Sequence, residues 1–311
     1  MTTFIPERPI VVIGGACGDM LLALPRLPVS GEDIEGEDLG QQIGGCAFNV
    51  ARVLFHLTVP IINGMPVGNG PWGKAVEAAM AELNLPVLLR NTEMDNGWCI
   101  AMTEPNGERT FIGITGCEAH CSRELLQQLT PPENAWIYVN GYELFGAGGK
   151  ALREWTLAQP QKKLVDFGPR LPFIPAEFIT ALSGTDTILT LNRDETKQLC
   201  GQGDPVSQAL RYAQRSGLTL ICRLDKEGAW ICPPDGAPTT IGAYAVNVVD
   251  TIGAGDAHSG GLLAGLSAGW PLPDAVDLAN RVAACVVAGK GAAGAPDWAT
   301  LRRYFPDSRL P

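Results

Sequence analysis

The 311-residue sequence lacks several features that mark whole classes of protein. It has no run of 18 apolar residues and no basic segment followed by an apolar one, so we expect a cytosolic protein without a membrane-spanning helix. Only 23 Lys and Arg residues stand against 33 Asp and Glu, and the net charge of −10 argues against nucleic acid or an anionic membrane surface as a partner. The lysine-containing phosphate-binding loop motif is also absent, which excludes a P-loop kinase.

Histidine is scarce, and the cysteines do not form a recognisable framework. Nine cysteines, an odd number scattered along the chain, fit reduced thiols better than disulfides. The segment Cys117-Glu118-Ala119-His120-Cys121 resembles a metal box, but the other histidines, His56 and His258, form no second pair at a suitable spacing. Because a structural zinc site needs four ligands, we expect no metal there.

Short apolar segments alternate with amphipathic ones along most of the chain. Ala47, Val50, Ala51 and Leu54, for example, follow the i, i+3, i+4, i+7 spacing of one helix face. The alternation predicts a three-layer α/β/α fold with a mainly parallel central sheet. The predicted strands are residues 10–13, 59–62, 86–89, 136–139, 164–166, 187–191 and 218–223, and further helices are predicted at 72–83 and 275–287.

Two regions depart from this alternation and predict a small β-strand flap. Residues 31–42 are polar and acidic without a helical stripe, and residues 98–103 and 110–115 are β-rich runs around Pro105-Asn106-Gly107-Glu108, a hairpin pattern. The alternative is an ordinary surface hairpin at a sheet edge. No repeat or long linker is visible, so we predict one domain over residues 1–311, with a lid formed by about 17–43 and 95–117.

The most informative segment is Val249-Asp250-Thr251-Ile252-Gly253-Ala254-Gly255-Asp256, which leads directly into an apolar helical stretch. Glycines let backbone N–H groups converge, and the positive end of a helix dipole favours anions. A carboxylate beside such an anion hole indicates a general base that removes a proton from an alcohol while N–H groups stabilise a phosphoryl group. The alternative is a helix that Asp256 merely caps.

The whole octapeptide resembles the C-terminal signature of the ribokinase (PfkB) family of carbohydrate and nucleoside kinases. The resemblance implies that Asp256 is the base and that the amides of Gly253, Ala254 and Gly255 form the anion hole. It also implies an ATP-dependent kinase that transfers the γ-phosphoryl group to a primary hydroxymethyl group, with Mg²⁺ bridging the phosphates. A sugar is favoured as acceptor, and a nucleoside is the alternative.

Two glycine-rich segments are candidates for binding that acceptor. Gly44-Gly45-Cys46-Ala47-Phe48-Asn49 opens a helix, and an Asn amide can both donate to and accept from a hydroxyl group. Asp19 follows the first predicted strand, where ligands of such sheets bind, and one carboxylate can accept from two neighbouring hydroxyls. The alternatives are a tight turn with a solvent-facing Asn and a turn Asp. The resemblance implies that Gly44, Gly45, Asn49 and Asp19 bind the acceptor.

The remaining candidates follow later strands. Asn192-Arg193-Asp194-Glu195 has the spacing of a helix capping box, and it also matches the family's Asn-x-x-Glu element, which implies that Glu195 orients a magnesium-bound water. Asp166 and Arg170 resemble the Asp-x-Asn-x-Arg element of some sugar-acid and fructose kinases, although Gly168 replaces its Asn. Arg170 is therefore a candidate for the substrate, with a surface Arg as the alternative.

Residues 223–229 lie between two predicted strands and are either a simple hairpin turn or, by the resemblance, a border of the nucleotide site. The family often holds a monovalent cation near residues 287–295, but this chain has Gly294-Ala295-Pro296 where a Ser is expected, which leaves potassium binding open. The resemblance also implies that the lid covers the sugar and is the candidate surface of a homodimer. Its further nucleotide-binding candidates are Asn192, Arg223, Lys226, Gly228, Thr251 and Asn280.

Two other function classes have to be considered. Gly68-Asn69-Gly70-Pro71-Trp72-Gly73 spells a dinucleotide-binding G-x-G-x-x-G, with Glu93 about 20 residues later, which allows an NAD-dependent oxidoreductase. Pro71 and Trp72 fit poorly where a backbone must approach a pyrophosphate. A non-catalytic sugar-binding sensor is the second alternative, although Asp256 and its glycines are all present.

Overall fold

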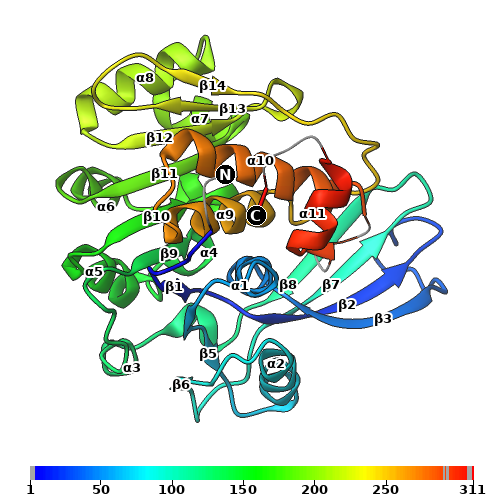
Figure 1. Ribbon diagram of the computed structural model, residues 1–311. Helices are drawn as coiled ribbons and strands as arrows, with labels where there is room; N and C mark the ends of the chain where they lie inside the picture. The colour runs from blue at the N-terminus through cyan, green and yellow to red at the C-terminus, as the bar shows by residue number, and fades with distance from the viewer. Residues whose placement is uncertain (1–3, 290, 292–293, 307–309) are drawn as a thin grey trace.

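The computed structural model describes residues 4–289, 291, 294–306 and 310–311, and its main feature is an eight-stranded sheet (Figure 1). The strand order is β14-β13-β12-β11-β10-β9-β1-β4, and the six strands from β12 to β4 are parallel. Two antiparallel strands, β13 and β14, complete one edge. The strands are β1 (Ile10–Ile13), β4 (Ile61–Gly64), β9 (Trp136–Asn140), β10 (Lys162–Asp166), β11 (Thr187–Asn192), β12 (Thr219–Arg223), β13 (Ala229–Cys232) and β14 (Thr239–Ile241).

Helices cover both faces of this sheet, as the alternation predicted. Along β1, Ile10 and Val12 join one apolar core while Val11 and Ile13 join the other, because successive side chains of a strand point to opposite faces. The first core is closed by α1 (Cys46–His56), α2 (Pro71–Glu82), α9 (Ala254–Ser267), α10 (Leu272–Val287) and α11 (Trp298–Tyr304). The second is closed by α3 (Arg123–Leu126), α4 (Gly141–Leu144), α5 (Lys150–Ala158), α6 (Ala176–Ala181), α7 (Arg193–Cys200) and α8 (Pro205–Ser216).

The predicted strand at residues 86–89 is wrong. Only Leu89 belongs to a strand, the two-residue β6 (Leu89–Arg90), which pairs with β5 (Pro66–Val67) outside the main sheet. Pro86 has no N–H to donate to a ladder, and Leu88 is 40% exposed, so this apolar run does not have the burial of a central strand. The strand predicted at residues 59–62 begins two residues later, at Ile61.

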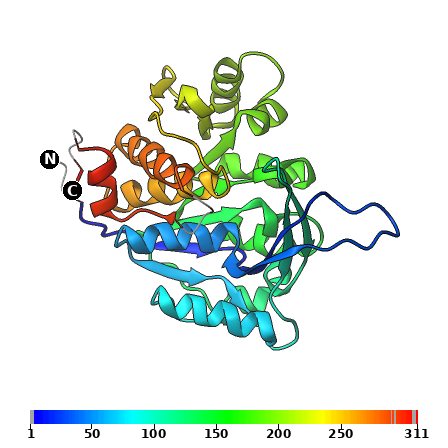
Figure 2. The ribbon, with the colours of Figure 1, turned by 90° about the vertical axis from the view of Figure 1, so that its right-hand side faces the viewer.

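A separate four-stranded sheet stands off the main sheet at the lower right of Figure 1, and Figure 2 shows the loop between β2 and β3 reaching furthest from the body. Its order is β3-β2-β7-β8, and β7 and β8 form the predicted hairpin around residues 105–108. Its strands are β2 (Cys17–Ala23), β3 (Glu37–Gly44), β7 (Trp98–Thr103) and β8 (Arg109–Ile114). Short 3-10 turns cover Cys117–His120, Gly168–Phe173, Leu182–Gly184 and Asp225–Glu227.

Helix α9 approaches α1 and α10 closely through three of its four glycines, which have no side chain. A Cβ on Gly260 would lie 2.6 Å from Val53 of α1, and a Cβ on Gly265 would lie 2.7 Å from the Cα of Ala275 in α10. Gly261 faces α10 in the same way, at 2.8 Å from Ala279 Cα. These contacts pack α9 closely against α1 and α10. Within the described part of the chain, no helix is long and apolar enough to cross a membrane.

We expect Gly265→Ala to destabilise the protein by about 1–3 kcal/mol, because the new methyl group overlaps the backbone of α10. At an open helix position the same change would stabilise by about 1 kcal/mol through helix propensity. Urea unfolding measures the difference. Gly184→Ala is the control, because a Cβ there meets nothing within 4 Å. A Gly265→Ala variant as stable as the parent would contradict this account of the packing.

Candidate active site

The parallel strands bring their carboxyl ends to one edge of the sheet, and most candidate residues lie along it. Asn140 ends β9 and stands opposite Asp166, the last residue of β10, in the strand register. Asn192 ends β11 and stands opposite Arg223, the last residue of β12. Polar side chains from four adjacent strands therefore meet at the edge where ligands of open α/β sheets bind.

Asp256 lies in the first turn of α9 and contacts α1. Its Oδ2 accepts a hydrogen bond of 2.8 Å from Nδ2 of Asn49. The Cys46 thiol is a second hydrogen-bond donor to this carboxyl. Burial raises the pKa of Asp256 to about 6, against the lowering effect of the Asn49 hydrogen bond. The structure thus joins the two glycine-rich segments that the sequence singled out, 207 positions apart.

The turn before α9 has backbone donors to offer. Gly253 is left-handed, with φ of 76°, and this lets the chain enter the helix abruptly. The Ala254 N–H donates to Thr251 O at 3.2 Å, so it is engaged within the turn. For the N–H groups of Gly255 and Asp256, no hydrogen bond is found among the described residues. Free N–H groups at the positive end of a helix form an anion-binding position.

Asp19 lies on β2 beside the glycine pair that precedes α1. Its Oδ1 accepts from the Cys99 thiol at 3.0 Å, and its Oδ2 accepts from Gln42 Nε2 at 3.5 Å. A Cβ on Gly44 would lie 2.4 Å from Asp19 Oδ2, so only glycine leaves room for this carboxylate. Burial raises the pKa of Asp19, although both hydrogen bonds act in the opposite direction. Gly45 has φ of 100° and packs against the carbonyl of Gly15.

Sequence reasoning missed Glu143, a buried acid at the same edge. It lies in α4, directly after β9, and is only 6% exposed. Burial, and then the charge of Glu118, raise its pKa to about 8. No partner for its Oε2 is found among the described residues, and a Cβ on Gly14 would lie 3.0 Å from this oxygen. An acid three residues beyond a buried strand was the sequence signal that could have revealed it.

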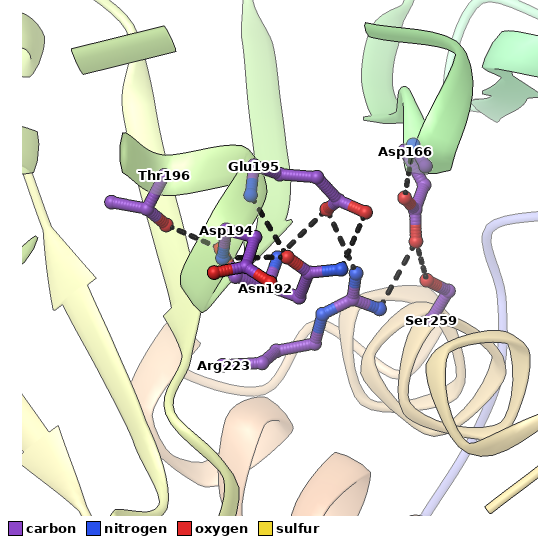
Figure 3. Close-up of polar contacts among 8 residues, drawn as sticks. Asp166, Asn192, Asp194, Glu195, Thr196, Arg223 and Ser259 are labelled. Carbon is purple, nitrogen blue, oxygen red and sulfur yellow. Dashed lines mark hydrogen bonds and ion pairs between the residues drawn. The ribbon is translucent and has the colours of Figure 1, made fainter. Parts of the chain in front are cut away.

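The capping box at the start of α7 is confirmed. Asn192 Oδ1 accepts from the N–H groups of Asp194 and Glu195, both at 2.9 Å. In return, Glu195 Oε2 accepts from the Asn192 N–H at 2.7 Å. Figure 3 shows that Glu195 also faces Arg223, which forms ion pairs with Asp166 at 3.0 Å and with Glu195 at 3.5 Å.

The segment after β12 is the hairpin turn that the sequence allowed. Gly228 has φ of 83°, and a Cβ there would lie 2.2 Å from the carbonyl oxygen of Ile241, so the chain passes very close to this residue. Lys226 is exposed within the 3-10 turn.

Two further nucleotide-side candidates flank this region. Asn280 of α10 donates both amide hydrogens to the carbonyls of Ile241 and Gly242, at 3.1 and 2.9 Å. The side chain of Asn280 therefore braces this loop. Thr251 is exposed. Residues 290, 292 and 293, within the proposed cation segment, lie outside the described residues.

Arg170 is held by aromatic rings rather than by an acid. Its guanidinium lies 4.9 Å from the centroid of Tyr142 and 4.7 Å from that of Phe145. Its Nε is buried, and no partner for it is found in the described part of the chain. Gly168, which replaces the Asn of the related motif, has φ of 53° and receives no side-chain contact within 4 Å at its Cβ position.

One ion pair connects the four-stranded sheet to the glycine-rich turn. Arg109, at the start of β8, donates from Nη1 to both carboxylate oxygens of Asp250, at 2.9 and 3.1 Å. Asp250 also accepts from the N–H groups of Ile252 and Gly291, at 3.1 and 2.9 Å. These hydrogen bonds, together with Arg109, lower its pKa against the effect of burial. No sequence pattern pointed to this pair.

The dinucleotide-binding interpretation of residues 68–73 is wrong. Asp95 already occupies the N-terminus of α2, where its carboxylate accepts from the N–H groups of Trp72 at 3.1 Å and Gly73 at 2.6 Å. A Cβ on Gly68 would lie 2.5 Å from the carbonyl of Met94, so these glycines serve close chain packing. A pyrophosphate would have to displace an internal carboxylate.

Comparison with known proteins identifies the family of the chain. Residues 8–299 match the family model described as pfkB family carbohydrate kinase. The chain is 38% identical over 303 residues to the uncharacterized sugar kinase YegV of Escherichia coli, covering 94% of both chains.

Solved structures share the fold at low sequence identity. Ribokinase from Thermotoga maritima superposes with a TM-score of 0.84 at 18% identity, covering 96% of this chain and 99% of that one. Aminoimidazole riboside kinase from Salmonella enterica, solved with aminoimidazole riboside and an ATP analogue, gives 0.77 at 24% identity, with 96% and 99% covered. The chain belongs to the pfkB family of carbohydrate kinases, a family of phosphotransferases, and has its ribokinase-like α/β fold.

Proposed function

We propose that this protein transfers the γ-phosphoryl group of ATP to a primary hydroxymethyl group of a sugar, with Asp256 as the general base. The observation that carries the proposal is the hydrogen bond between Asn49 and Asp256. It places a candidate acceptor-binding amide and a partly buried carboxylate side by side, at the N-terminus of the helix where, among the described residues, two N–H groups have no partner. A hydroxyl bound by Asn49 would lie within reach of the base.

The carboxylate has a suitable proton affinity for this role. A pKa of about 6 keeps Asp256 ionised at neutral pH and makes it a stronger base than an ordinary Asp. The N–H groups of the turn at Gly253–Gly255 would stabilise charge on the transferring group. Because Ala254 already donates within the turn, we assign the larger share of this stabilisation to Gly255.

The nucleotide site is proposed at the N-termini of α9 and α7 and along the turn at Gly228. ATP would bring magnesium, which bridges phosphate oxygens and neutralises their charge. No group of three His, Cys, Asp or Glu side chains able to hold a metal is found among the described residues, so the ion would take its ligands mainly from phosphates and water. Glu195 would orient one such water. Asn192, Lys226, Thr251 and Asn280 remain candidates around the nucleotide.

The acceptor would be bound by Asp19, Asn49 and the glycine pair at residues 44–45, and Glu143 adds a second acid to this group. Carboxylate and amide oxygens of this kind would suit a ligand rich in hydroxyls. Trp98 stacks on Trp72 with ring centroids 6.2 Å apart, so its ring packs within the protein, which favours a sugar over a nucleoside base. Arg170, with its unpartnered Nε, remains a candidate for the outer part of the acceptor.

The four-stranded sheet is the proposed lid, and its outer strand is the proposed dimer surface. On β8, Phe111, Ile112 and Ile114 are 54%, 51% and 48% exposed. Their strand is the last of its sheet, so its outer edge has no paired strand among the described residues. An exposed apolar edge strand fits a second copy of the same chain, which would cover it. Closing the lid would exclude water from the transferring phosphoryl group.

The proposed function is tested by incubating the purified protein and ATP with pentoses, hexoses, sugar acids and nucleosides. We expect transfer to a sugar, and Asp256→Asn should lower kcat by about 10²–10⁴-fold because the base is lost. Thermal stability should hardly change. Asp274→Asn, the same substitution in the exposed first turn of α10, is the control and should retain activity. Near-normal transfer by Asp256→Asn would refute the role.

The pH dependence follows from the raised pKa. Asp256 must be deprotonated to accept a proton, so kcat/KM for the sugar should decline below pH about 6. The decline should approach tenfold per pH unit, as expected for one essential group. Steady-state rates between pH 5 and 8, with saturating ATP and magnesium, measure the profile. A rate that stays constant down to pH 5 would contradict this assignment.

The proposed dimer predicts a mass of twice 33.0 kDa in solution by light scattering. Ile112→Asp places a charge on the exposed strand and should convert the dimer to a monomer without unfolding it, since this side chain is largely in solvent. Phe173→Asp, at a 63% exposed position outside the four-stranded sheet, is the control. A monomeric parent protein at micromolar concentration would refute this interface.

A further inference from the structure

Arg223 occupies the centre of a charged cluster at the carboxyl edge of the sheet, shown in Figure 3. Its Nη1 pairs with Asp166 Oδ2 at 3.0 Å and its Nη2 with Glu195 Oε2 at 3.5 Å. The three side chains are between 6% and 15% exposed. They come from β12, β10 and α7, so one guanidinium connects three elements that are distant in the sequence.

The same cluster touches the first turns of α9 at two points. A Cβ on Gly255 would lie 2.8 Å from Arg223 Nη1, so the guanidinium lies directly against the helix backbone there. One turn later, Ser259 donates to Asp166 Oδ2 at 3.4 Å. Gly255 and Ser259 lie on one face of the helix, four residues apart. This face of α9 therefore rests on the Arg223–Asp166 pair.

The cluster also sets the charge around Asp256. The groups that interact with this carboxyl include Asn49 and Cys46 from α1, Tyr138 from β9, Tyr142 from α4, Asp166 from β10 and Arg223 from β12. Among them Arg223 is the single positive charge. Its pKa stays raised through its two acids despite burial, so it is charged at any working pH. Burial weakens screening by water, which strengthens its effect on a neighbouring anion.

We propose that Arg223 is a positioning residue for phosphoryl transfer: it holds the first turns of α9 in place and keeps a fixed positive charge beside Asp256 and the anion hole. The inference rests on the proposed function for its catalytic meaning. It differs from a direct contact with the nucleotide, because both Nη atoms of Arg223 are already bound by carboxylates. Arg223 acts through Gly255 and Asp256.

The first test measures the Asp256 carboxyl itself and needs no substrate. Its pKa is followed by ¹³C NMR in protein labelled at the aspartate carboxyls, with the signal assigned by its loss in Asp256→Asn. Arg223→Met removes a positive charge and should raise this pKa. Asp166→Asn removes a negative charge and should lower it. A loosened structure alone would not move the pKa in opposite directions.

Two further variants complete the test. Arg223→Lys keeps the charge and should leave the pKa near the parent value. Lys163→Met removes another buried cation, whose Nζ is held by the carbonyls of Gln159 and Gln161, and should leave the pKa unchanged. An unchanged Asp256 pKa in both Arg223→Met and Asp166→Asn would overturn the proposal. If Arg223→Met does not fold, Arg223→Gln also removes the positive charge and replaces it in the test. The opposite pKa shifts therefore stay measurable.

Kinetics then separate positioning from nucleotide binding. Arg223→Met should lower kcat by about 10²-fold, the loss typical of one electrostatic group, while KM for ATP changes less than threefold. The acid limb of its rate profile should move to higher pH. A large rise in KM for ATP with kcat preserved would show direct nucleotide binding instead and overturn the proposal. A parent protein that phosphorylates nothing refutes the proposed function alone, because the carboxyl titration remains interpretable.

Discussion

The hydrogen bond between Asn49 and Asp256 depends on how closely α1 and α9 approach each other across the edge of the sheet. That approach requires Gly260 at the helix contact, and it requires Gly45 to start α1 with a backbone angle that other residues rarely adopt. The candidate base is therefore placed by glycines rather than by large side chains. Small changes in packing far from Asp256 would alter its distance from a bound hydroxyl.

The proposed site contains several acids, although the phosphates of ATP are themselves negatively charged. Asp19, Glu143 and Asp256 all have raised pKa values, because burial disfavours their ionised forms. In the proposed site Glu143, with a pKa of about 8, would be mostly protonated at neutral pH, which would reduce repulsion towards ATP while its oxygens stay available to hydroxyl groups. The compensating positive potential comes from the N-terminus of α9 and from Arg223, which is bound between two acids.

The layers of the fold and the cap of α7 could be predicted from the sequence, because both depend on local sequence patterns. Strand–helix alternation gave the layers, and the Asn192–Glu195 spacing gave the capping box. What could not be predicted depends on pairs that only the fold brings together. Nothing in the sequence indicates that folding buries Glu143. Likewise, nothing in it indicates that Arg223 forms an ion pair with Asp166 of another strand. The strand predicted at residues 86–89 was wrong because apolar character alone does not distinguish a central strand from a connecting segment.

The contact between Arg109 and Asp250 would couple the two substrate sites of the proposed kinase. It ties the hairpin β7–β8 to the loop from which α9 begins, with Asp250 fixing the N–H groups of Ile252 and Gly291 on the other side. The hairpin cannot swing outward without breaking this pair and releasing the loop. If the hairpin covers the sugar and the loop binds the nucleotide, as proposed, sugar binding and nucleotide binding would be thermodynamically linked, and such linkage is reciprocal. High ionic strength, which screens a partly exposed pair, would weaken the coupling before it affected either binding site.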